Sequence, residues 1–92
     1  MRKVTMDELV KRAVHRFGID LYSAEDAMLL IKFCQQASIP VLGIDAFKIR
    51  EEKIQPSMEN SIDLSSKENA HDIAIQFLTD RYNLDFMYEV VY

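Results

Sequence analysis

Few residues in this 92-residue chain are of the types that catalyse reactions, and their spacing builds no catalytic group. The histidines, His15 and His71, are far apart in sequence, and neither is at metal-ligand spacing from another histidine or from the single cysteine, Cys34. Cys34 lies in an apolar segment without a neighbouring base, which favours a place in the core over a nucleophilic role. We therefore predict no catalytic residues, no metal ion, no cofactor and no enzyme activity.

Carboxylates are the most abundant reactive group, and their distribution along the chain is uneven. Residues 1–50 contain eight Lys and Arg against six Asp and Glu, whereas residues 51–92 contain three against nine. Neutralising phosphate requires clustered basic residues, so the acidic second half disfavours nucleic acid as a partner. It favours a basic protein partner. The simpler alternative is that the acidic residues only keep the surface soluble.

Helices are predicted in three segments. Thr5 to Glu8 has the pattern of a capping box, and apolar residues at helical spacing follow until Phe17, with Gly18 as a left-handed stop. Ser23 is the predicted N-cap of a largely buried helix from Ala24 to about Ala37, and residues 19–22 form a short connector. A second capping box at 65–68 predicts a third helix that ends near residues 82–83.

Strands are predicted at residues 39–49 and 85–92, because both segments are rich in β-branched and aromatic residues. Gly43 marks a bulge or a close backbone approach. A hairpin return at 53–57 is confined to a sheet edge by Pro56, and residues 57–64 read as a loop. The terminal strand should pair with the strand at 41–49. The chain is thus predicted to be a single α+β domain over residues 1–92, in the order α-α-β-(β)-α-β, with the helices on one face of a small antiparallel or mixed sheet.

A resemblance to a known family rests on the run Ile39-Pro40-Val41-Leu42-Gly43-Ile44-Asp45-Ala46-Phe47. It resembles the "I-P-x-L-G-G-D-V-Y" core of the immunity protein 40 family, although Ile44 replaces the second glycine. An Ala-rich helix before the motif and a Tyr-rich final strand also resemble that family. Its members are small bacterial α+β proteins regarded as immunity partners of polymorphic and contact-dependent growth inhibition toxins, many of which are nucleases. The resemblance implies an inhibitor of a cognate toxin that works by protein–protein interaction.

The predicted partner-binding residues are all acidic. The resemblance carries over Asp45 as the counterpart of the family's aspartate; the alternative is that its carboxylate caps backbone N–H groups beside Gly43. The remaining predicted residues come from the segment 51–63, which has the fewest residues expected in the core. They are Glu51, Glu52, Glu59 and Asp63. The expected partner is a basic toxin domain, whose association such a surface would accelerate.

The expected cellular location follows from the lack of a predicted membrane span, signal peptide and disulfide. No apolar run reaches the ~18 residues of a membrane span, and the N-terminal pattern is not that of a signal peptide. With one cysteine and no internal disulfide, a cytoplasmic location fits best. We expect a monomer when the partner is absent. The alternative function is a structural or assembly subunit that pairs through its terminal strand.

Overall fold

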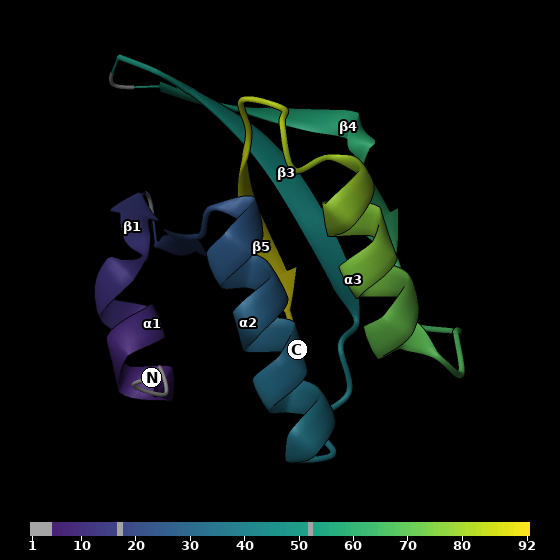
Figure 1. The fold of residues 1–92 in the computed structure, drawn as a ribbon. Helices are drawn as coiled ribbons and strands as arrows, with labels where there is room; N and C mark the ends of the chain where they lie inside the picture. Colours follow the sequence, from purple (N-terminus) through teal and green to yellow (C-terminus); the bar gives the residue numbers. More distant parts are fainter. Residues whose placement is uncertain (1–4, 17, 52) are drawn as a thin grey trace.

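Two α-helices cover one face of a three-stranded antiparallel sheet in the computed structural model, which describes residues 5–16, 18–51 and 53–92 (Figure 1). The helices are α1 (Met6–Arg12), α2 (Ala24–Gln36) and α3 (Ala70–Asp80). The strands are β1 (Val14–Arg16), β2 (Ile19–Leu21), β3 (Gly43–Arg50), β4 (Lys53–Asp63) and β5 (Met87–Val91). This arrangement confirms the predicted α+β class, with α2 and α3 on the covered face of the sheet.

Helix α1 is shorter than predicted, and the segment that follows it is a β-hairpin. Ala13 takes extended dihedral angles (φ −62°, ψ 144°), and β1 then pairs antiparallel with β2. Gly18 has a φ of +76°, so its left-handed conformation serves the hairpin and not a helix end. The predictions of a helix through Phe17 and of a connector at 19–22 were therefore wrong, and Phe17 lies outside the described residues. In the hairpin, Leu21 of β2 pairs with Val14 and is fully buried.

The N-caps of the first two helices are confirmed. The Thr5 hydroxyl accepts a hydrogen bond from the Glu8 N–H (3.2 Å), and the Ser23 hydroxyl accepts one from the Asp26 N–H (3.2 Å). Helix α2 lies within one residue of its predicted bounds and is the central helix of the core, with fully buried side chains at Ala27, Leu30, Ile31 and Cys34.

Strand β3 is the middle strand of the sheet, whose order is β4-β3-β5. The predicted pairing of the terminal strand with this segment is confirmed. The strand begins at Gly43 and not at Ile39, because residues 38 and 39 still terminate α2. Ser38 takes the left-handed conformation (φ 58°), and the Ile39 N–H donates to the Cys34 carbonyl (2.8 Å).

Strand β4 corrects the prediction of a loop at 57–64. The strand continues to Asp63, and Pro56 lies within it at the sheet edge, as expected. Its pairing with β3 shifts by three residues, so that residues 58–61 form a bulge opposite Asp45. The Ser61 hydroxyl accepts from the Ala46 N–H (2.9 Å) and donates to the Ser57 carbonyl (2.7 Å), which closes the bulge. The bulge interrupts the alternation of apolar and polar residues by which a strand is detected in sequence.

Helix α3 begins at Ala70, four residues after the start that a cap at Ser65 predicts. The Ser65 N–H donates to the Asp63 carboxylate (2.9 Å) in a turn, and Asn69 precedes the helix without a side-chain capping bond. Between the sheet and the two helices lies a core that includes Ile44, Ala46 and Tyr88. Among the described residues, no helix is long and apolar enough to cross a membrane.

Candidate partner-binding surface

The sheet has one face turned away from α2 and α3, here called the outer face. Along β3, Ile44 and Ala46 are fully buried on the helix side, so Asp45 between them points to the outer face. Along β5, Tyr88 and Val90 are buried and Glu89 between them is half-buried. The pleat of the sheet therefore places Asp45 and Glu89 on the same outer face.

Asp45 and Glu89 are directly opposite each other in the register of β3 and β5. Residues opposed in this way have their Cβ atoms about 5 Å apart, and like charges at such positions destabilise a sheet. Burial raises the pKa of Glu89, and the neighbouring charges of Asp45 and Asp20 raise that pKa further. The outer face thus holds two opposed carboxylates, and the pKa of Glu89 is raised mainly by its burial.

Asp20 reaches this group from the small β1–β2 hairpin. The hairpin is joined to the main sheet through Tyr22 and Tyr88, whose backbone groups exchange two hydrogen bonds of 2.7 Å each. His15 is opposite Asp20 in the hairpin, and its Nδ1 is hydrogen-bonded to the Asp20 carboxylate. Both side chains are exposed. The charge of Asp20 contributes to the raised pKa of Glu89, so the hairpin adds a third carboxylate to the electrostatic environment of the pair.

A hollow of about 260 Å³ lies beside Asp45, between the end of β5 and the bulge of β4. Two acidic residues, Asp45 and Asp63, line it together with Gly43 and Ser61. The remaining lining residues are apolar: Leu42, Met58, Ile62 and Val91. The hollow therefore combines apolar walls with negative charge.

Asp63 has a structural role in addition to its place in the hollow. Its carboxylate accepts the hydrogen bond from the Ser65 N–H, and the bonds to Ser65 lower the pKa of Asp63 below its usual value. The amide of the next residue, Ala46, donates to the Ser61 hydroxyl, and among the described residues no N–H donates to the Asp45 carboxylate. The local geometry thus gives no support to the capping alternative for Asp45.

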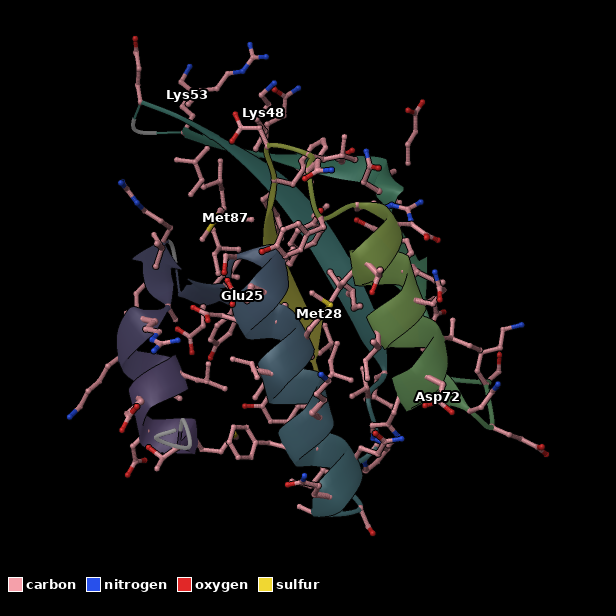
Figure 2. The ribbon with its side chains drawn as sticks, viewed as in Figure 1. Glu25, Met28, Lys48, Lys53, Asp72 and Met87 are labelled. Carbon is pink, nitrogen blue, oxygen red and sulfur yellow. The ribbon has the colours of Figure 1, made fainter. Side chains whose placement is uncertain are left out.

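Of the other predicted acidic residues that the structure describes, Glu59 lies near Asp45 and Glu51 does not. Glu59 is exposed in the bulge opposite Asp45, so it borders the same region. Glu51 lies at the tip of the β3–β4 hairpin with a φ of 52°, six residues along the strand from Asp45, which corresponds to about 20 Å. Glu52 lies outside the described residues. Figure 2 shows Lys48 and Lys53 at this end of the hairpin, so the region of Glu51 also carries basic side chains.

The sequence analysis missed Glu89 and Asp20. A signal for Glu89 was present, because the period-two pattern of residues 86–92 places it on the side opposite Tyr88 and Val90. The register that sets Glu89 against Asp45 cannot be read from that pattern. Asp20 was missed because its segment was predicted as a connector, although it is the middle residue of β2.

The remaining chemically reactive residues are separate from this surface. Cys34 is fully buried, and burial raises the pKa of its thiol, which disfavours the thiolate. His71 Nε2 donates to the Ile39 carbonyl (2.7 Å), where it joins α3 to the segment after α2. In the described part of the chain, no three residues of the metal-binding types are grouped to hold an ion.

Comparisons of the chain with family models, with curated proteins and with solved structures found no match. The resemblance to the immunity protein 40 family accordingly stays a prediction from the residues, and the geometry of the outer face is an independent basis for inferring function.

Proposed function

We propose that this chain is a bacterial immunity protein that binds and neutralises a cognate toxin, in the manner expected of the immunity protein 40 family. The observation that carries the proposal is the opposition of Asp45 and Glu89 on the outer face of the sheet. Asp45 is also the residue that the family resemblance implies. Two separate lines of reasoning therefore lead to the same side chain.

The opposed carboxylates favour a binding function because they cost stability in the free protein. A partner that brings cationic side chains to this face would relieve the repulsion, so part of the binding free energy would come from the removal of that cost. Nuclease toxins fit this requirement, since a site that attracts phosphate is basic. The protein would act in the cytoplasm as a monomer, by occupying or bordering that site.

The test is protection of cells. The chain is co-expressed with the toxin domain encoded by the gene immediately upstream of its own, and growth is followed. Wild-type protein should restore growth, whereas the double variant Asp45→Asn with Glu89→Gln should protect poorly at an equal expression level. Asp72→Asn is the matched control, because Asp72 is exposed on α3, over the covered face of the sheet (Figure 2). Growth arrest despite wild-type protein would contradict the proposal.

Assembly through the terminal strand has less support as a function. One edge of β5 is paired with β3, and on the other edge Tyr22 exchanges two hydrogen bonds with Tyr88. These bonds occupy backbone groups that an added strand would need. On the other side of the sheet, the edge strand β4 contains Pro56 and a bulge, both of which discourage pairing with another chain.

A further inference from the structure

Exposed apolar side chains gather around the outer-face hollow. Among the large hydrophobic residues exposed in the described part of the chain, three line this hollow: Leu42 (43% exposed), Met58 (84%) and Val91 (36%). They come from the segment before β3, from the bulge of β4 and from the end of β5. Single exposed hydrophobic residues need no explanation, but convergence from three segments on one hollow is typical of a binding surface.

The bulge that presents Met58 is fixed by hydrogen bonds from within the protein. The Asn60 amide donates to the Ser57 hydroxyl (3.0 Å), and the Arg81 Nε donates to the Asn60 side-chain oxygen (3.3 Å). Arg81 is itself held, because its Nη1 donates to the Phe77 carbonyl (3.2 Å) and its guanidinium lies 3.8 Å from the centre of the Phe77 ring. The bulge therefore has its shape before any partner arrives, which lowers the entropic cost of binding.

The charge of the hollow indicates what it would bind. Its described lining contains two aspartates and no lysine or arginine. An arginine or lysine side chain has an apolar stem and a cationic end, so it can contact apolar walls and carboxylates at the same time. An apolar centre bordered by charged groups is also the usual organisation of a protein–protein interface.

We propose that this hollow binds one arginine or lysine side chain of a basic partner protein, with Leu42, Met58 and Val91 around its stem and with Asp45 and Asp63 at its cationic end. This inference rests on the proposed function and assigns the contact by which the toxin is held. Met58 packs against the stem of the inserted side chain, so it governs the dissociation rate, whereas the two carboxylates govern association.

The first experiment needs no toxin. N-acetyl-L-arginine methylamide is titrated into the ¹⁵N-labelled chain, with N-acetyl-L-norleucine methylamide as the uncharged control. The arginine probe should shift the amide signals of Gly43, Ser61 and Asp63 saturably, with a dissociation constant on the order of 10 mM, and the norleucine probe should not. The shifts should be lost in Asp45→Asn and kept in Asp72→Asn. Equal shifts from both probes, or arginine shifts centred elsewhere, would overturn the inference.

The second experiment measures binding to the toxin domain encoded upstream. Met58→Ala should raise the dissociation rate constant about tenfold and leave the association rate constant within twofold. The control is Leu84→Ala, which removes another large exposed apolar side chain, outside the hollow. Wild-type binding that Met58→Ala does not change would overturn this inference and leave the proposed function standing. No binding by wild-type protein would overturn the proposed function. The arginine titration would then show by itself whether the hollow binds a cationic side chain.

A second copy of the chain is the other occupant that the experiments address. Sedimentation of the free protein should show a monomer at micromolar concentration. A dimer that Met58→Ala dissociates would mean that the apolar rim binds another copy of this chain, and it would overturn the assignment to a basic partner.

Discussion

Asp45 and Glu89 lie directly opposite each other on the neighbouring strands β3 and β5, with their side chains on the uncovered face of the sheet. Two negative charges at such positions repel each other in the free protein. Burial and the charges of Asp45 and Asp20 raise the pKa of Glu89, in agreement with that repulsion. This pair is the structural basis of the proposed function, because a cationic partner bound at the outer face would remove the repulsion.

Glu89→Gln should stabilise the free protein at pH 7 by about 0.5 kcal/mol, since it removes one of two opposed charges. Because the pKa of Glu89 is raised in the folded state, the folded protein takes up this proton before the unfolded chain does as pH falls. Its contribution to stability therefore increases as pH falls through the raised pKa towards the ordinary value of 4.5. Urea unfolding between pH 4 and 8 measures this. The gain from Glu89→Gln should shrink with falling pH, and a constant gain or a loss would contradict the assignment.

Gly43→Ala should destabilise the protein by about 2 kcal/mol. A Cβ atom at Gly43 would lie 2.9 Å from the Ile62 carbonyl oxygen on β4, and a backbone atom in a paired strand cannot easily move away. Gly18→Asn is the control, because nothing lies within 4 Å of a Cβ at Gly18 and asparagine tolerates its positive φ. Denaturant unfolding of both variants tests this. Equal stability of Gly43→Ala and wild type would show that the two strands are farther apart there.

Tyr88→Phe should leave stability unchanged or raise it by up to about 1 kcal/mol. The Tyr88 side chain is fully buried, and its hydroxyl has no hydrogen-bond partner among the described residues. An unpaired buried hydroxyl costs free energy, so its removal relieves a penalty while the ring remains in place. Thermal and urea unfolding measure the difference. A loss of more than about 1 kcal/mol would mean that the hydroxyl makes a stabilising hydrogen bond.

Ile31→Asp should unfold the domain, because Ile31 is fully buried at the centre of α2 and the introduced carboxylate would be unpaired in the core. The neighbouring change Lys32→Ala, at an exposed position of the same helix, should alter stability by less than about 0.5 kcal/mol. Circular dichroism and a urea titration suffice. A cooperative transition for Ile31→Asp at the wild-type midpoint would show that the core is wrongly placed.

The sequence predicted the parts of the fold that depend on local signals. Ser23 and the apolar surface of residues 24–37 are sufficient to define α2, since both the cap and the buried face act within one helix. The alternation in residues 86–92 likewise predicted β5. The hairpin of β1 and β2 was missed because Val14 continues the helical spacing of α1. Val14 is in a strand because it pairs with Leu21, and this pairing cannot be read from local spacing.

The candidate surface was predicted less well, because it depends on register. Asp45 was found through the resemblance, and Asp63 through the acidic character of its segment. The bulge at residues 58–61 moves Asp63 beside the start of β3, while Glu51 remains at the hairpin tip. The separation of these residues along the sequence does not reveal which of the two lies near Asp45. For the same reason Glu89 joins Asp45 only once the strands are paired.

The most direct test of the central claim is the rate at which the chain associates with the toxin domain encoded upstream, measured by stopped-flow at several salt concentrations. The double variant Asp45→Asn with Glu89→Gln should associate about tenfold more slowly than wild type at low salt, and its rate should depend less steeply on salt, since steering by these charges is screened. Asp72→Asn should behave as wild type. An association rate and salt dependence that the double variant leaves unchanged, with the fold intact, would contradict the claim that the outer face of the sheet binds the toxin.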